Sequence, residues 1–203
     1  MTKLTPKGAA TRARIVEAAT DLVLERGVGG TSLDDIRAGT ATSKSQLFHY
    51  FPGGKSELVG AIAAFQMERV LEAQRPWLDR LDTWPAWQGW RDAVVDFYSA
   101  QTHLSCSISA MVNELTYTDP ARASEVAAHA ERWCAYLAAG LHRMHAKGQL
   151  RPDSDPDRLA LSTFAALQGG LLIMQARDSI EPLAAALDGA LASLHSYAAD
   201  LQK

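Results

Sequence analysis

Apolar residues recur at helical spacing along most of the chain. Between Thr11 and Arg26 they form an i, i+3, i+4, i+7, i+8 series, which only an α-helix gathers on one face: Ile15, Ala18, Ala19, Leu22 and Val23. Similar patterns return in later segments, and no segment of useful length alternates in the manner of a half-buried strand. The pattern therefore predicts an all-α fold.

Three helices are predicted in the first fifty or so residues. Gly27 ends the first helix as a C-cap. Thr31 opens the second in a T-x-x-D pattern with Asp34, and Ser43 opens the third in an S-x-x-Q pattern with Gln46. A Pro-Gly-Gly sequence then stops the third helix.

Longer helices are predicted in the rest of the chain. The expected segments are a connector helix over 55–75, a loop from Pro76 to Trp90, a helix carrying Trp90, Val94 and Phe97, a short helix over 108–117, and helices over 120–147, 156–177 and 182–201. We expect two domains, with the boundary between residues 55 and 56.

Charge is unevenly divided between these two parts. Residues 1–58 hold eight Lys and Arg against six Asp and Glu, whereas the remainder holds twelve against seventeen, which gives +2 and −5 within a total of −3. A modestly basic head on an acidic body suits a nucleic-acid-binding head, although so small a difference also arises by chance.

The cysteines and the N-terminus indicate a cytoplasmic protein. Cys106 and Cys134 form no C-x-x-C pair, so neither a disulfide scaffold nor a zinc ribbon is indicated. The basic N-terminal residues are not followed by the apolar stretch of a secretory signal. The longest apolar run, over 159–176, contains Ser, Thr and Gln residues and a Gly pair, so we interpret it as a buried helix rather than a membrane span.

The second and third predicted helices have the spacing of a helix-turn-helix, in which the later helix enters the major groove of DNA. The third helix exposes polar side chains that can reach bases or phosphates and keeps Leu47 and Phe51 for packing. Taken singly, His49, Tyr50 or Lys55 is an ordinary surface residue; their joint occurrence favours DNA binding.

The segment TSLDDI, followed by SKSQLFHYF and then KSEL at 55–58, resembles the signature of TetR-type transcriptional regulators over about residues 10–58. The resemblance implies that Lys44, Gln46 and His49 face the groove, that Tyr50 and Lys55 touch phosphates, and that Thr31 anchors the second helix on the backbone. We place Ser43 in the same interface. It also implies a homodimer, a palindromic operator in double-stranded DNA, and a helical C-terminal domain for dimerisation and ligand binding.

The turn departs from the family pattern. Ala41 stands where the family usually has Gly, and Thr40 and Thr42 replace the usual Ala and Val. Gly39 lies nearby and is able to take the special backbone conformation instead.

The last two predicted helices carry more apolar residues than one contact stripe needs. We expect part of this surface to form a four-helix dimer interface, with Ala165, Gly169, Leu187, Leu191 and Leu194 as the candidate residues. The alternative is a large monomeric core.

A largely apolar small-molecule effector is expected to bind among the body helices. The candidates combine aromatic and Met residues with a few polar groups: Trp90, Phe97, His103, Met111, Trp133, Gln168 and Met174. Each of them is also explained by plain core packing.

Metal binding, cofactors and catalysis are not expected. His142 and His145, and likewise His103 and Cys106, have ligand spacing without a third ligand in sequence. The chain contains no nucleophile motif or phosphate-cradling loop. The prediction is a repressor released from its operator by an effector; the alternatives are a dimeric DNA-binding regulator without an effector and, more remotely, a helical enzyme.

Overall fold

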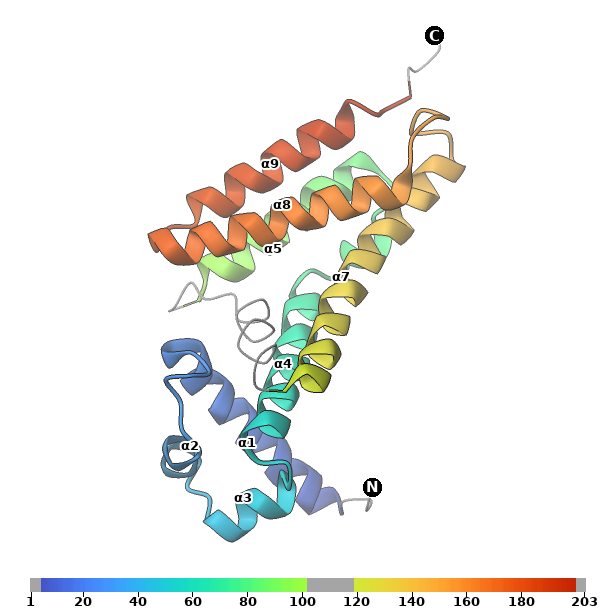
Figure 1. Ribbon diagram of the computed structural model, residues 1–203. Coiled ribbons are helices and arrows are strands. Elements are labelled where there is room, and N and C mark those ends of the chain that lie inside the picture. Colours follow the sequence, from blue (N-terminus) through green and yellow to red (C-terminus); the bar gives the residue numbers. More distant parts are fainter. Residues whose placement is uncertain (1–4, 102–118, 200–203) are drawn as a thin grey trace. The chain divides into compact units, whose positions relative to one another are not determined.

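A computed structural model describes residues 5–101 and 119–199, which are helical with short connections (Figure 1). The described helices are α1 (Pro6–Arg26), α2 (Leu33–Thr40), α3 (Lys44–Tyr50), α4 (Gly54–Ala73), the 3-10 turn η1 (Leu78–Arg80), α5 (Trp84–Ser99), α7 (Pro120–Ala146), α8 (Pro156–Arg177) and α9 (Glu181–His195). The described residues form no strand, only one isolated antiparallel bridge between Leu150 and Ala198. The helix expected over 108–117 lies outside these residues.

Two helices begin earlier than predicted, for the same reason. Thr5 caps α1 by accepting a hydrogen bond from the Gly8 N–H, and a Pro follows it at the first helical position. Thr83 likewise caps α5, with Pro85 in its first turn, so the expectation of a loop up to Trp90 was wrong. In both segments the helix begins at a Thr N-cap with a Pro in the first turn. The starts predicted from the apolar stripe were too late, because the stripe begins after this signal.

The chain forms two compact units, and each is described by itself. The first comprises the described residues of Met1–Glu68 and Ser107–His129, and the second those of Arg69–Cys106 and Ala130–Lys203. Both units contain parts of α4 and α7, because their boundaries fall inside these two helices. The division between residues 55 and 56 stays a prediction.

The core of the first unit joins the three N-terminal helices to the start of α4. Side chains from all four helices are fully or almost fully buried, among them Ile15, Ala19, Val23, Ile36, Leu47, Leu58 and Ile62. α1 packs on α2. The head therefore has a core of its own. Each large aliphatic side chain buried in this core stabilises the fold by about 1.5–3 kcal/mol.

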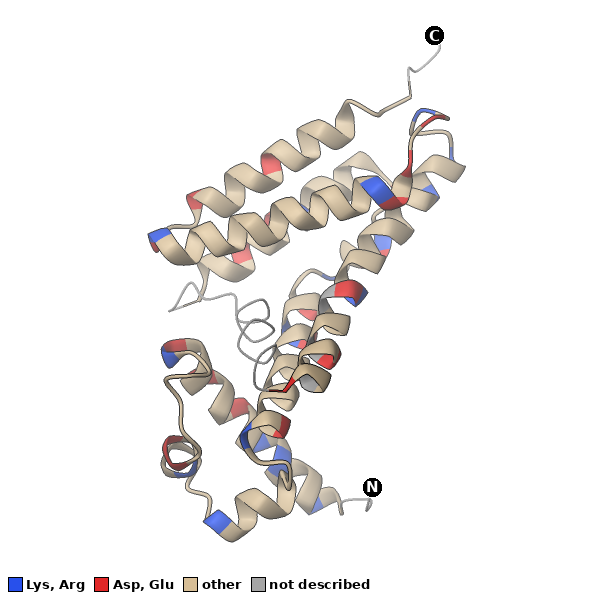
Figure 2. Cartoon of the chain, viewed as in Figure 1, with Lys and Arg blue, Asp and Glu red and all other residues tan. Residues whose placement is uncertain are grey.

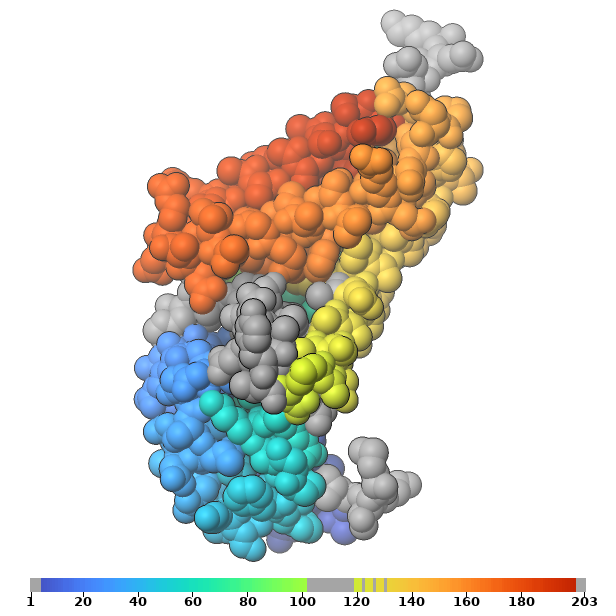
Figure 3. Space-filling view, viewed as in Figure 1, coloured from blue at the N-terminus to red at the C-terminus, as the bar shows by residue number. Residues whose placement is uncertain are grey.

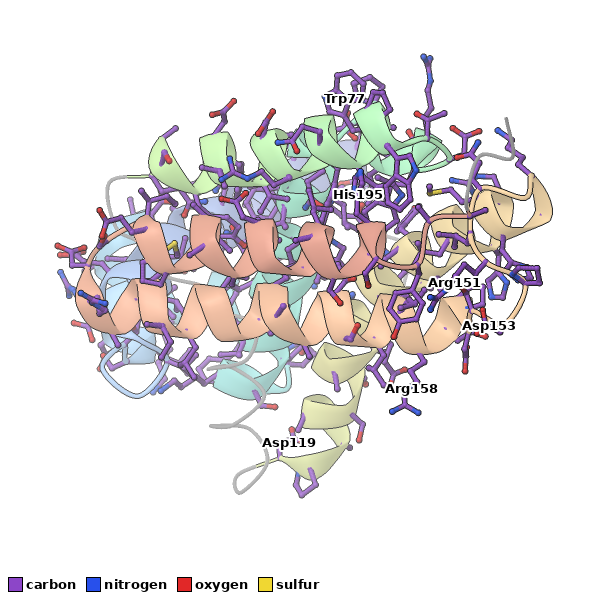
Figure 4. All side chains as sticks on the ribbon, turned by 90° about the horizontal axis from the view of Figure 1, so that it is seen from above. Trp77, Asp119, Arg151, Asp153, Arg158 and His195 are labelled. Atoms are coloured by element: carbon purple, nitrogen blue, oxygen red, sulfur yellow. The ribbon has the colours of Figure 1, made fainter. Side chains whose placement is uncertain are left out.

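In the second unit α8 runs beside α9, and α5 packs on α9 (Figure 4). Gly170 permits the close approach of α8 and α9, because an added Cβ would lie 3.0 Å from the Leu183 Cα and from the Ala186 Cβ. Trp77 lies against α5 at Gly89, where an added Cβ would meet the indole at 2.6 Å. Gly170 therefore sets the spacing of α8 and α9, and Gly89 leaves room for the Trp77 indole against α5.

A buried amide holds two tryptophans in this unit. The Gln74 Oε1 accepts hydrogen bonds from the Trp90 Nε1 at 2.6 Å and the Trp133 Nε1 at 3.0 Å. Its Nε2 donates to the Val70 carbonyl at 2.7 Å. All three side chains are buried. Gln74 thus satisfies two indole donors that would otherwise be costly to bury.

α8 is long and apolar enough to cross a membrane by length and composition alone, with a mean hydropathy of 1.4 over eighteen residues. A core helix of a water-soluble protein passes the same test. Its residues Leu159, Leu167, Leu171 and Met174 are buried within the protomer. Figure 2 shows no charged residue on α8 between its charged ends, so its apolar composition also extends to an exposed face.

Candidate nucleic-acid interface

Ser32 caps α2, rather than Thr31 as expected. The Ser32 hydroxyl accepts a hydrogen bond from the Asp35 N–H at 3.1 Å, and the Asp35 carboxylate accepts one from the Ser32 N–H at 2.8 Å. The Ser32 hydroxyl also donates to the Asp35 carboxylate at 2.5 Å, and this bond, followed by the bond from the Ser32 N–H, holds the pKa of Asp35 below its usual range. Reciprocal capping of this kind begins the helix at a defined residue.

Thr31 itself points into the protein. Its side chain is fully buried, and its hydroxyl donates to the Gly27 carbonyl at 2.8 Å. This side chain therefore fastens the end of α1 to the start of α2, and its contact with DNA stays a prediction. The neighbouring Ser32 is the exposed hydroxyl at this position.

The turn between α2 and α3 takes its special backbone conformation at Ala41. Ala41 has φ 50° and ψ 40°, in the left-handed region that usually favours glycine. Gly39 is an ordinary residue inside α2, so it does not substitute for Ala41. An added Cβ on Gly39 would lie 2.9 Å from the Leu22 Cδ1, so this glycine instead allows α2 to pack closely on α1.

Two threonines and an arginine hold this strained turn. The Thr40 hydroxyl donates to the Ile36 carbonyl at 2.7 Å and lies 2.8 Å from the Thr42 hydroxyl, with both threonines buried. The Arg14 Nη1 on α1 donates to the Thr40 carbonyl at 2.8 Å. These bonds compensate for the missing glycine, so the departure from the family pattern leaves the turn intact.

Ser43 and Gln46 form a second capping box at the start of α3. The Ser43 hydroxyl accepts from the Gln46 N–H at 3.1 Å, and the Gln46 Oε1 accepts from the Ser43 N–H at 3.2 Å. Both side chains are exposed, but their oxygens already have partners in the helix. Their contact with DNA stays a prediction, and the structure gives them a first role in positioning α3.

The outer face of α3 is formed by Lys44, Ser45, Phe48 and His49, all exposed. Leu47 lies on the opposite side in the core. Residues four apart lie on one face of a helix, so Phe48 follows Lys44, and His49 follows Ser45, one turn later. The sequence analysis did not select Phe48 as a site residue, although its place one turn after Lys44 was the available signal.

Tyr50 and Lys55 flank this face at the junction of α3 and α4, and both are half-buried. The Tyr50 ring packs edge-on against His49 with centroids 5.0 Å apart. Within the described part of the chain neither Lys44 nor Lys55 forms an ion pair, whereas Arg37 pairs with Asp34 at 2.6 Å. The two lysines therefore present positive charge around α3 that no carboxylate among the described residues neutralises.

The candidate effector residues fall into three groups. Trp90, Trp133 and Met174 are fully buried, and Phe97 and Gln168 are half-buried. His103 and Met111 lie outside the described residues. Because the Trp90 and Trp133 indoles already donate to Gln74, they act as core residues, and their contact with an effector stays a prediction.

The candidate dimer residues fall into a buried group on α9 and an exposed group on α8. Leu187, Leu191 and Leu194 are buried within this chain and contribute to its own core, so their contact with a partner chain stays a prediction. Ala165 and Gly169 are exposed on α8. Larger exposed side chains that the sequence pattern did not single out lie on the same helix: Leu161 and Leu172, each 61% exposed, and Ile173, 47% exposed.

The two histidines on α7 have individual partners. His142 Nε2 lies 2.9 Å from the Asp157 Oδ1, and His145 Nε2 lies 3.4 Å from the Pro152 carbonyl. Among the described residues there is no group of three potential metal ligands. The pair of His103 and Cys106 falls outside them.

A helix-turn-helix head followed by a larger helical body is typical of DNA-binding transcriptional regulators. Residues 15–62 match the model of the tetR family of bacterial regulatory proteins, and residues 88–190 match the tetracyclin repressor-like C-terminal domain. The chain belongs to the TetR family of transcriptional regulators.

Relatives and solved structures agree with this assignment. An uncharacterised HTH-type transcriptional regulator of Mycobacterium tuberculosis is 28% identical over 185 residues, covering 85% of this chain and 88% of the relative. The HTH-type transcriptional repressor DhaR of Mycobacterium sp. (strain GP1) is 26% identical, covering 85% and 86%. A TetR regulator from Chloroflexus aurantiacus has the same fold, with a TM-score of 0.79, 24% identity and coverage of 96% and 98%.

Proposed function

We propose that this TetR-family regulator is a repressor that binds a palindromic operator as a homodimer and leaves it when a small molecule binds the body. The observation that carries the proposal is the outer face of α3, which presents Lys44, Ser45 and His49. α3 is held by its own capping box and follows a hydrogen-bonded turn after α2, which has a capping box as well. A DNA reader needs a rigid helix with exposed hydrogen-bonding side chains, and this head supplies both.

The roles of the interface residues follow from their exposure and chemistry. Lys44 and His49 reach base edges in the groove. Tyr50 and Lys55 contact phosphates at the side of α3, where the Lys55 ammonium is available without an internal ion pair. Ser43 and Gln46 hold the first turn of α3 and contact DNA through the donor groups that capping leaves available.

Homodimerisation is supported by the exposed faces of α8 and α9. On α8 most of the exposed residues between its charged ends are apolar or small: Leu161, Ala165, Gly169, Leu172, Ile173 and Ala176. The polar exceptions are Ser162 and Gln175. On α9 they include Ala185, Gly189 and Ala192, and an added Cβ on Gly169 or Gly189 would meet nothing within 4 Å. In Figure 3 the side chains of α8 form a broad continuous surface next to α9. Two such faces packed together make a four-helix interface.

Two features support the proposed release by an effector: the helical body, which matches the family model of the C-terminal domain, and the helix α4. Because α4 contains residues of both compact units, a ligand that favours one arrangement of the body changes the orientation of α4 and thereby the separation of the two heads. We further propose that the protein acts in the cytoplasm, where it meets both DNA and metabolites.

DNA titration of three variants tests the interface. Site-specific affinity should fall at least about tenfold in Lys44→Ala and in His49→Ala, because each loses a contact to DNA. Arg80→Ala is the matched control, since it removes one exposed positive charge from η1, outside the head. Unchanged affinity in both α3 variants would refute the assignment of α3 as the reading helix.

Salt and ligand dependence separate the proposed functions. Affinity should fall steeply with salt, and the salt slope should decrease by about one unit in Lys55→Ala when a phosphate contact is lost. A small-molecule library screened by thermal shift should give ligands that stabilise the protein and weaken its DNA binding. Salt-dependent binding that no stabilising ligand weakens would favour the regulator without an effector.

A further inference from the structure

Phe48 is an exposed aromatic residue on a face that is otherwise polar. Its side chain is 41% exposed, although Leu47 directly before it and Phe51 three residues after it are buried. One edge of its ring lies near the start of α4, since a Cβ added to Gly54 would be 3.8 Å from the Phe48 Cε1. The ring is therefore supported on one edge and open to solvent on the other.

Phe48 shares its helix face with the residues proposed to read DNA. It lies one turn after Lys44, which corresponds to about 6 Å along the axis of α3. Stacked base pairs are about 3.4 Å apart, so Lys44 and Phe48 reach base pairs about two steps apart when α3 lies along the groove. Phe48 therefore faces DNA whenever Lys44 does.

The chemistry of a phenyl ring restricts what it can recognise there. It offers no hydrogen-bond donor to a phosphate oxygen and no partner for the polar edges of guanine, adenine or cytosine. The apolar group that the major groove displays is the 5-methyl of thymine, which apolar side chains including Phe contact. A contact with this methyl group would also remove the exposed ring from water.

We propose that Phe48 is a specificity-determining residue that contacts the 5-methyl group of one thymine in each half-site. This inference rests on the proposed function, in which α3 enters the major groove. It assigns a defined base preference to a side chain that would otherwise be an isolated exposed apolar residue, a common feature of protein surfaces.

The test replaces single thymines by uracil, which lacks only the methyl group. The full-length protein first selects its preferred site from random-sequence duplexes, and each thymine in that site is then changed in turn. For the wild type, uracil at one position in each half-site should weaken binding on the order of tenfold, and uracil elsewhere should have little effect. A selected site at which no uracil substitution matters would overturn the inference.

A double-mutant cycle assigns the effect to Phe48. Phe48→Ala should bind the thymine duplex about as weakly as the wild type binds the sensitive uracil duplex, and it should no longer distinguish the two. Phe48→Tyr keeps the ring and should keep the discrimination. Phe48→Ala could instead lose the same affinity on both duplexes and so distinguish thymine from uracil as strongly as the wild type does. That result would contradict the inference.

Two further readouts keep the outcome interpretable. Circular dichroism and sedimentation establish that Phe48→Ala is folded with the same oligomeric state; if it is not, the wild-type uracil series and Phe48→Tyr still decide the question. A selection that enriches no sequence would refute the proposed function, and the inference with it. A selected site that is insensitive to uracil would refute the inference alone.

Discussion

At the scale of single residues, Ala41 stands in a backbone conformation that costs a residue with a Cβ about 1–2 kcal/mol. Bonds from Thr40, Thr42 and Arg14 surround it and maintain the turn. The stability of the reading head therefore includes a local penalty that a single substitution can remove.

Ala41→Gly should raise the free energy of unfolding by about 0.5–1 kcal/mol, because relief of the strain exceeds the extra entropy that glycine gives the unfolded chain. Ala38→Gly is the matched control, since Ala38 is exposed in the helical part of α2 and the same change should destabilise by about 0.5–1 kcal/mol. Urea denaturation measures both values. Destabilisation of similar size in the two variants would show that Ala41 is not strained.

Gln74→Met should destabilise the protein by about 2–4 kcal/mol, because it leaves the Trp90 and Trp133 indole N–H groups buried without an acceptor. Gln88→Met on the exposed side of α5 is the control and should change stability by less than about 0.5 kcal/mol. Denaturation followed by tryptophan fluorescence gives both numbers. A loss as small as that of the control would mean that the indoles have other acceptors.

At the scale of elements, the head is built from short helices whose ends are determined by side chains. α2 and α3 each begin with a reciprocal capping box, so their first turns do not depend on packing alone. The first of these boxes contains a titratable group, which makes the stability of α2 sensitive to acid.

The Asp35 cap should make stability depend on pH in the acid range. The pKa of Asp35 is lowered in the folded state from its usual 3.8, so its contribution is complete above that value and is lost as the pH falls through the lower folded pKa. Unfolding free energy should therefore fall more steeply below about pH 4 in the wild type than in Asp35→Asn. Ser45→Ala, which changes an exposed side chain that does not titrate, should keep the wild-type slope. Parallel slopes for the wild type and Asp35→Asn would contradict the capping role.

Element positions were predictable where a stripe of apolar residues and a terminal signal agreed. α8 begins at Pro156 and ends at Arg177, as the pattern predicts. α5 was expected to start later because the Trp-rich and Pro-rich segment before Trp90 was interpreted as a loop, although Thr83 is an N-cap and Pro85 suits a first turn. The cap of α2 was misplaced by one residue, because Thr31 and Ser32 both suit an N-cap and only the fold decides which is buried.

At the scale of the whole molecule, sequence patterning could not decide which chain covers an apolar face. Leu187 and Leu191 form a stripe that suits a dimer interface and a protomer core equally well, and in the structure it is buried in the core. The polar interface was more predictable, since Lys44 and His49 are exposed as the pattern indicates. Apolar residues recur at the same helical spacing whether they face the core of the protomer or a partner chain, so the spacing does not distinguish the two. A polar face is expected to be exposed whether or not a partner chain is present.

Leu172→Arg should disrupt the homodimer while leaving the protomer folded, because Leu172 is 61% exposed on α8 and a guanidinium would be buried in the proposed interface. Sedimentation should show a monomer, and the affinity for a palindromic site should fall by a factor of ten or more when two heads no longer bind together. Gln88→Arg, on the exposed side of α5, should remain a dimer. A dimeric Leu172→Arg variant would place the interface elsewhere.

Two copies of α3 are proposed to bind one symmetric DNA site. The most direct measurement is selection of random-sequence duplexes by the full-length protein, followed by determination of the stoichiometry on the enriched site. We expect inverted half-sites whose centres lie one or more helical turns of about 10–10.5 base pairs apart, bound by an even number of protomers. Enrichment of no sequence, or of a single half-site bound by one protomer, would contradict this proposal.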